Sequence, residues 1–270
     1  MVLVPIELTG ISVLVTRPCN QADGLCHLIE EHGGEAVRFP TIGIGKSVNP
    51  TRLATALTAV PNAHTAVFLS PNAVVYGLNA LESNGVALPS GIEVVAIGPG
   101  TAARLAQSGV VTTAIPKDQF DSEGLLQLKQ FALPTGKLIL IFGGEGGREW
   151  LANQLRKAGA QVVQIECYRR SLPEATGGKV IARWRERGID VVTLTSVLAA
   201  DNLVTLLGSY ADTLLRRAII VTISQRIVDH CSAWWGWQGP FQVARHAGDN
   251  ALLQAIHECW LSRSTSSGCR

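Results

Sequence analysis

The stretch TAVFLSPNAVVYGLNAL (residues 65–81) contains an apolar run, a small polar junction and a helical pattern in direct succession. Residues 66–69 form a continuous apolar run without period-2 alternation, which is typical of a strand buried on both faces of a parallel sheet. Ser70-Pro71-Asn72 follows, and serine is a preferred helix N-cap. Residues 72–82 then carry a helical pattern. The stretch therefore predicts one strand–helix unit of an α/β protein.

The same unit recurs outward from this stretch in both directions. The expected strands are residues 12–16, 36–39, 66–69, 93–97, 111–114, 138–142, 161–165, 190–194, 218–223 and 241–244. The expected helices are residues 20–32, 72–82, 100–108, 122–132, 147–158, 197–207, 225–233 and 249–261. Regular alternation of strands and helices predicts a doubly wound α/β architecture with parallel sheets.

The chain also repeats itself at an offset of 126 residues. Val13-Leu14-Val15 corresponds to Ile139-Leu140-Ile141, and Ser70 corresponds to Ser196. The repeat predicts two copies of one module, with residues 39–42 and 165–168 at equivalent places. Two α/β modules favour a cleft between them, and open α/β sheets bind ligands at the carboxyl ends of their strands.

Composition limits the class of protein. The 270 residues suit one large or two medium domains, and 47 % are hydrophobic. A net charge of +2 argues against a nucleic-acid binder. We find no export signal or membrane span, and the six scattered cysteines fit reduced thiols, so we expect a cytoplasmic protein. The histidines lack metal-ligand spacing, which predicts no metal site.

Several strand-to-helix junctions consist of small or hydroxyl residues. They are Ser70-Pro71-Asn72, Gly98-Pro99-Gly100-Thr101, residues 143–147 (GGEGG), Thr195-Ser196 and residues 222–224 (TIS). Unpaired N–H groups at a helix N-terminus, approached over small residues, bind anions. The same residues also serve as ordinary caps and turns, so both interpretations stay open. The glycine stretch lacks the spacing of a nucleotide-binding loop.

Tyr168 ends the predicted strand at residues 160–168, in the segment equivalent to residues 39–42. At that crossover we expect it to face the cleft. A phenol has a reference pKa near 10, so it is neutral at pH 7 and can donate a proton to a leaving group. The alternative is a tyrosine that only packs at a hinge.

Taken together, the motifs resemble the uroporphyrinogen-III synthase family over nearly the whole chain, from about residue 11 to residue 259. The matching motifs are VTRP (15–18), FP-I (39–42), FLSPNAV (68–74), AIGPGTA (96–102), GGREWL (146–151), ECYRR (166–170), LTS (194–196), ISQR (223–226) and DNALLQAI (249–256). Two departures stand out: glycine at position 143, where many relatives have arginine, and Arg226-Ile227, where some have threonine.

The resemblance implies two flavodoxin-like lobes joined by a two-stranded linker, with lobe two inserted into lobe one. Lobe one would comprise residues 1–40 and 170–262, lobe two residues 43–165, and the linkers residues 39–42 and 165–169. Residues 263–270 would form a disordered tail.

The resemblance also implies a reaction. Family members close hydroxymethylbilane, a linear tetrapyrrole with eight carboxylates, losing water and inverting ring D through a spiro intermediate without cofactor or metal. Tyr168 matches the tyrosine expected to assist loss of the hydroxyl. The residues expected to bind substrate are Arg17, Ser70, Pro71, Asn72, Gly98, Thr101, Gly144, Ser196, Val197 and Ser224. We expect a monomer that binds neither nucleic acid nor membrane, and a transient contact with hydroxymethylbilane synthase is compatible with this reading.

Two other functions remain open on the residues alone. A bilobed binding or sensor protein without chemistry has the same two-module organisation. A nucleotide-dependent transferase would use the glycine stretch, but the Lys-Ser/Thr pair of a phosphate-binding loop is missing.

Overall fold

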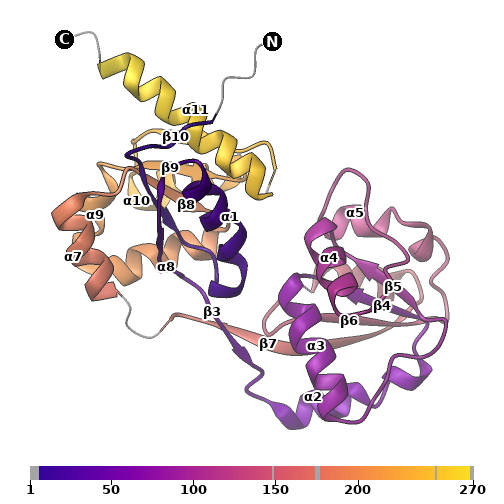
Figure 1. Ribbon diagram of the computed structural model, residues 1–270. Helices are drawn as coiled ribbons and strands as arrows, with labels where there is room; N and C mark the ends of the chain where they lie inside the picture. The colour runs from indigo at the N-terminus through magenta and orange to yellow at the C-terminus, as the bar shows by residue number, and fades with distance from the viewer. Residues whose placement is uncertain (1–5, 148, 174–176, 247, 268–270) are drawn as a thin grey trace. The chain divides into compact units, whose positions relative to one another are not determined.

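The computed structural model describes residues 6–147, 149–173, 177–246 and 248–267. Its internal contacts divide the chain into two compact units (Figure 1). Unit one comprises Met1–Gly43 and Ser171–Arg270, and unit two comprises Ile44–Arg170.

Unit one is built on a five-stranded sheet with the order β10-β9-β8-β1-β2. Its strands are β1 (Ser12–Val15), β2 (Glu35–Arg38), β8 (Val191–Leu194), β9 (Ile219–Thr222) and β10 (Phe241–Val243). Its helices are α1 (Cys19–Glu31), α7 (Gly177–Arg187), α8 (Val197–Leu207), α9 (Ala211–Leu215), α10 (Gln225–Trp235) and α11 (Asp249–Ser267), with a 3₁₀ turn at Gly208–Tyr210. β1 pairs in parallel with β2 and β8, and β9 with β8 and β10.

Helices cover both faces of this sheet (Figure 1). On one face α1 and α11 pack together over the odd-numbered residues of the central strands, including Val13, Val15 and Val191, all of them buried. Helices α8 and α10 lie against β8 and β9 on the opposite face. The central strands are apolar throughout because both of their faces are buried.

Unit two is built on a second five-stranded sheet, with the order β3-β7-β6-β4-β5. Its strands are β3 (Gly43–Lys46), β4 (Thr65–Phe68), β5 (Glu93–Ala96), β6 (Leu138–Gly144) and β7 (Gln161–Ser171). Its helices are α2 (Pro50–Leu57), α3 (Pro71–Ser83), α4 (Pro99–Gln107), α5 (Ser122–Leu126) and α6 (Trp150–Lys157), with 3₁₀ turns at Val60–Asn62 and Lys129–Phe131. β4 pairs in parallel with β5 and β6, and β6 with β7.

This sheet also carries an apolar cluster on each face. One cluster joins α2, α3 and α4 to the sheet and contains the stacked rings of Phe68 and Phe142, with centroids 4.6 Å apart. The other joins α5 and α6 to Val67, Ile139 and Ile141. Both faces are therefore covered, as the continuous apolar runs predict.

The strand orders agree with the sequence repeat. The offset of 126 residues maps β5, β4, β6 and β7 onto β9, β8, β1 and β2, and these four strands have the same order in both sheets. In each sheet the chain reverses its direction of winding between two central strands, β8 and β1 in one and β4 and β6 in the other. Ligands of doubly wound sheets bind at such switch points.

The structure corrects three expectations. Residues 111–114 form no strand, and only Ala114 bridges to Val95. The expected helix 122–132 ends at Leu126, and a separate 3₁₀ turn follows. Helix α11 continues to Ser267, so residues 263–267 are not a disordered tail, and residues 268–270 lie outside the described residues.

Several elements were not expected from the sequence: β3, α2, α7 and α9. In the part of the chain that the structure describes, no helix is long and apolar enough to cross a membrane.

Candidate functional site

Three predicted site residues meet at the carboxyl end of the sheet of unit two. Ser70 follows β4 and is the N-cap of α3, Gly144 ends β6, and Tyr168 lies on the neighbouring strand β7. β4 and β6 are the two strands of the switch point. Ser70, Gly144 and Tyr168 therefore occupy the place where this fold binds ligands.

An irregularity in β7 directs Tyr168 toward this site. Gly143 pairs with Glu166 and the next residue, Gly144, pairs with Tyr168, so Cys167 is an extra residue in β7. Strict alternation would place neighbouring side chains on opposite faces. Instead, Cys167 and Tyr168 are both buried in the cluster that contains α3. Bulges of this kind re-aim side chains next to active sites.

The Tyr168 hydroxyl has two polar partners. It lies 3.2 Å from the Oγ atom of Ser70 and accepts a hydrogen bond of 3.0 Å from the guanidinium of Arg170. The Arg170 guanidinium also lies 5.5 Å from the centre of the Tyr168 ring. Tyr168 is only 1 % exposed, whereas Ser70 is partly exposed. The structure thus differs from the expectation that the ring faces an open cleft, because the ring is packed in the core of unit two.

Gly144 provides space for the tyrosine ring. A Cβ atom at this position would lie 2.8 Å from the Cε2 and Cζ atoms of Tyr168 and 3.2 Å from its hydroxyl oxygen. The sequence predicted Gly144 as a substrate-binding residue. The geometry gives it a second role, because only glycine lets β6 pass this close to the ring.

Helix N-termini surround this end of the sheet. The Ser70 hydroxyl accepts a hydrogen bond of 3.0 Å from the backbone N–H of Ala73, and so caps α3. Gly98 is the N-cap of α4 without a side-chain hydrogen bond. No atom would contact a Cβ at Gly100 within 4 Å, so the first turn of α4 is open on the side of Gly100, whereas Phe120 packs against Gly98. Asn72 and Thr101 are buried, at 4 % and 3 % exposure, and support these turns from within.

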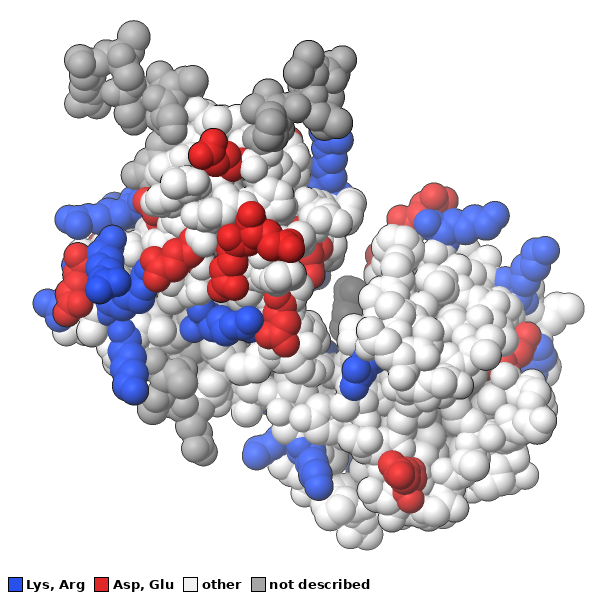
Figure 2. All heavy atoms as spheres, viewed as in Figure 1, with Lys and Arg blue, Asp and Glu red and all other residues white. Residues whose placement is uncertain are grey.

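Figure 2 shows a largely uncharged surface over the part of unit two that carries α3 and α4 in Figure 1. An anion on this face would therefore be held by backbone N–H groups, hydroxyl groups and helix dipoles more than by lysine or arginine.

The remaining predicted residues belong to unit one. Ser196 caps α8 as Ser70 caps α3, with a hydrogen bond of 3.0 Å from the N–H of Ala199. Val197 begins α8, and Ser224 is the N-cap of α10 without a side-chain hydrogen bond. Arg17 forms an ion pair with Asp249 at the start of α11, which neutralises part of its charge. Arg17 thus also holds α11 to the end of β1.

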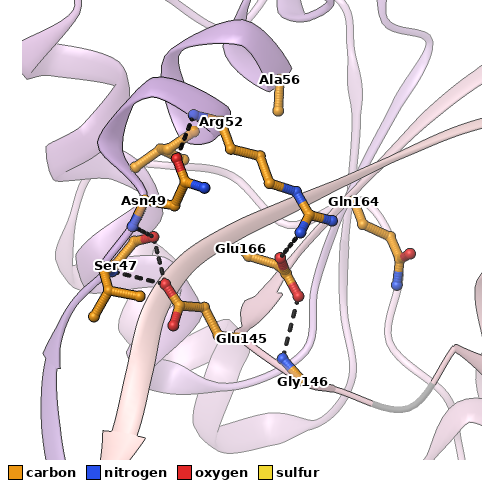
Figure 3. Close-up of a pocket in the computed structure, with 10 residues that line it drawn as sticks. Ser47, Asn49, Arg52, Ala56, Glu145, Gly146, Gln164 and Glu166 are labelled. Carbon is orange, nitrogen blue, oxygen red and sulfur yellow. Dashed lines mark hydrogen bonds and ion pairs between the residues drawn. The ribbon is translucent and has the colours of Figure 1, made fainter.

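A cavity of about 400 Å³ lies elsewhere in unit two, where β3 leads into α2 (Figure 3). It is lined by Ser47, Val48, Asn49, Arg52, Leu53, Ala56, Glu145, Gly146, Gln164 and Glu166, and by none of the predicted site residues. Two carboxylates in its wall disfavour an anionic ligand.

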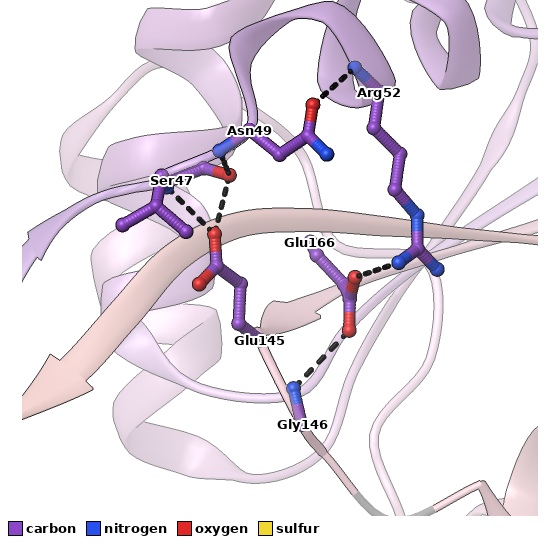
Figure 4. A network of polar contacts seen from close by, with 7 residues as sticks. Ser47, Asn49, Arg52, Glu145, Gly146 and Glu166 are labelled. Carbon is purple, nitrogen blue, oxygen red and sulfur yellow. Dashed lines mark hydrogen bonds and ion pairs between the residues drawn. The ribbon is translucent and has the colours of Figure 1, made fainter.

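Those carboxylates hold the structure around the cavity together (Figure 4). Glu145 accepts hydrogen bonds from the Ser47 hydroxyl, at 2.5 Å, and from the N–H of Val48, at 2.8 Å. Glu166 accepts one from the N–H of Gly146 and pairs with Arg52 at 3.3 Å. The network therefore fixes the loop after Gly144 to β7 and to the start of α2.

Cys167 is a buried thiol beside the site. Burial raises its pKa to about 12, although hydrogen bonds to the backbone oppose this rise. An unfolded thiol ionises near pH 9. Folding thus favours the neutral thiol. The contribution of Cys167 to the free energy of unfolding is complete below pH 9 and is lost as the pH rises from 9 toward 12. We expect Cys167→Ala to reduce the fall in stability above pH 9 by roughly 1.4 kcal/mol for each pH unit.

Urea unfolding of the wild type and the variant at pH 8, 9 and 10 measures this slope. Cys19→Ala is the control because Cys19 is an exposed free thiol. Equal pH slopes for the wild type and Cys167→Ala would contradict the assignment.

Comparison with known proteins decides the family. The family model described as "Uroporphyrinogen-III synthase HemD" matches residues 23–253. The chain belongs to the uroporphyrinogen-III synthase family. A uroporphyrinogen-III synthase of Salmonella typhimurium is 32 % identical over 91 % of this chain and 99 % of its own length. One of Escherichia coli is 31 % identical with the same coverage.

Solved structures show the same fold. A mutant uroporphyrinogen III synthase of Thermus thermophilus matches with a TM-score of 0.63 at 17 % identity, over 94 % of this chain and 100 % of its own. The Helicobacter pylori enzyme matches with a TM-score of 0.59 at 13 % identity, over 92 % and 99 %. These TM-scores support the α/β fold with parallel sheets, and the family assignment comes from the sequence matches.

Sequence reasoning missed Arg170 as a member of the site. It lies two residues after Tyr168 in the motif ECYRR, and residues two apart in a strand lie on the same face. That spacing was the available signal. Among the described residues, no three His, Cys, Asp or Glu side chains gather as a metal site requires.

Proposed function

We propose that this protein is a uroporphyrinogen-III synthase, a lyase that closes hydroxymethylbilane with loss of water and inversion of ring D in tetrapyrrole biosynthesis. Relatives of that name match the chain over 91 % of its length. The observation that carries the proposal is the placement of a phenol, a serine hydroxyl and a glycine together at the switch point of the sheet of unit two.

The proposed site residues act on two features of the substrate. Tyr168 supplies the proton that converts the departing hydroxyl into water. The open first turn of α4 and the capped start of α3 provide partial positive charge for substrate carboxylates. Ser196, Val197 and Ser224 offer equivalent helix starts in unit one. Catalysis then depends on holding the linear chain in the conformation that closes with ring D inverted, and on stabilising charge as it develops.

We further propose that the two units are the two lobes expected from the sequence, with lobe two inserted in lobe one through β3 and β7. Four strands have the same order in both sheets, which supports two copies of one module. We also propose a cytoplasmic monomer that makes a transient contact with hydroxymethylbilane synthase.

A coupled assay tests the function. Hydroxymethylbilane is generated in situ, this protein is added, the products are oxidised, and the porphyrin isomers are separated by chromatography. We expect isomer III to predominate. A folded sample that yields only isomer I, the product of unassisted closure, would overturn the proposal and favour a binding protein without chemistry.

A further inference from the structure

Three side chains form a continuous line of hydrogen bonds at the proposed site. The guanidinium of Arg170 lies 3.0 Å from the Tyr168 hydroxyl, which lies 3.2 Å from the Ser70 hydroxyl. An arginine side chain can only donate hydrogen bonds. The oxygen of Tyr168 therefore accepts from Arg170, and the phenolic proton must point elsewhere.

Burial determines the direction of the next bond. If Ser70 donated to Tyr168, the phenolic proton would have no acceptor among the described residues, in a side chain that is 1 % exposed. Leaving a buried donor unsatisfied costs about 1–3 kcal/mol. Tyr168 therefore donates to Ser70. The oxygen of Ser70 also accepts from the N–H of Ala73, so its two acceptor positions are filled.

The Ser70 proton then remains available. Ser70 is partly exposed, and its hydroxyl has no acceptor among the described residues. The buried phenol can therefore reach a bound ligand only through Ser70, whose side chain is partly exposed and can contact that ligand directly.

We propose that a proton relay runs through these three side chains. Ser70 transfers its proton to the leaving hydroxyl, Tyr168 replaces the proton on Ser70, and Arg170 stabilises the resulting phenolate. This proposal rests on the proposed function. The Ser70 O–H proton passes to the substrate hydroxyl, the carbon–oxygen bond breaks and water leaves. The Tyr168 proton moves to Ser70 at the same time. The resulting Tyr168 phenolate lies beside the Arg170 guanidinium. The proton that the substrate loses when the ring closes is transferred back through Ser70 to Tyr168.

Ser70→Gly tests the role of the hydroxyl in proton transfer while largely preserving the cap of α3. Glycine is tolerated at an N-cap with a loss of only a few tenths of a kcal/mol, but it carries no hydroxyl. We expect Ser70→Gly to lower kcat about tenfold or more, with KM changed less than about twofold. Ser70→Thr keeps both the cap and the hydroxyl and should recover most of the turnover. Asn49→Ala, which removes the cap of α2, is the control for lost capping alone.

Arg170 is tested in the same assay. Arg170→Gln removes a charged hydrogen-bond donor from the Tyr168 oxygen. Loss of such a bond corresponds to a factor of about ten or more in rate, so kcat should fall by about that factor. Arg170→Lys keeps the charge and should recover part of it. Arg169→Gln, at the exposed neighbouring position, is the matched control and should leave kcat unchanged.

Combination with Tyr168→Phe gives the decisive readout. In a relay, Ser70→Gly and Arg170→Gln cause little further loss of kcat once the phenol is removed, because all three act on one proton. Losses that multiply in the combined variants, or a wild-type kcat for Ser70→Gly, would overturn the relay. A wild-type protein that makes no isomer III would instead overturn the proposed function itself.

Discussion

Tyr168→Phe lowers kcat by about 10²-fold or more, while the affinity for the porphyrinogen product changes little. General acid catalysis contributes about 10²–10⁴-fold, and this variant removes the acid and leaves the ring in place. The ring is packed against Gly144 and Tyr76, whose ring centre lies 5.9 Å away, so phenylalanine fills the same space. The coupled isomer assay gives kcat, and thermal stabilisation by added product gives the affinity.

Tyr210→Phe is the matched control for this variant. Tyr210 lies in unit one, is 42 % exposed and contacts the guanidinium of Arg185. Its hydroxyl has no part in the proposed chemistry, so kcat should equal that of the wild type. Wild-type turnover in Tyr168→Phe would remove Tyr168 from the role of acid and leave it as a packing residue.

The sequence was sufficient to predict the α/β class, because both faces of each sheet are covered and the strands are consequently continuous apolar runs. The run at residues 66–69 corresponds to β4, and Ser70 caps the following helix as its residue type indicates. The repeat placed Ser70 and Ser196 at equivalent helix starts, and both side chains make the same capping hydrogen bond.

Other elements lacked a local signal. β3 consists of GIGK, and glycine is depleted in strands, so its pairing with β7 comes from tertiary structure. Helix α7 begins with two glycines and has a strongly charged surface, which weakens its helical pattern. Residues 111–113 are β-branched, but Val111 is 81 % exposed, and the segment pairs with β5 only through a single bridge at Ala114.

The strand that carries Tyr168 was predictable, but the surroundings of its ring were not. A bulge adds one residue to β7, and no sequence pattern marks Cys167 as that residue. Alternation would have put Tyr168 on the other face of the sheet. The contact with Gly144 and the hydrogen bond from Arg170 both depend on this bulge, so they appear only in the folded structure.

Gly144→Ala should therefore impair both the stability and the activity of the protein. The added Cβ would lie 2.8 Å from two ring atoms of Tyr168, closer than such contacts occur, and backbone on one side and core on the other restrict movement of the ring. Overpacking a core costs about 1–3 kcal/mol. A shift of the ring also separates its hydroxyl from Ser70 and Arg170, so we expect kcat to fall about tenfold or more.

Gly143→Ala is the matched control for stability, since its Cβ would meet only Leu69, at an ordinary distance of 3.6 Å. Unfolding in urea should show a loss for Gly144→Ala alone. The effect should also depend on the ring. In a Tyr168→Ala background the added methyl group has no aromatic neighbour at 2.8 Å, so Gly144→Ala should cause little further destabilisation. Equal losses in both backgrounds would mean that Gly144 is required by its own backbone rather than by the tyrosine, and the steric account of the site would then be wrong.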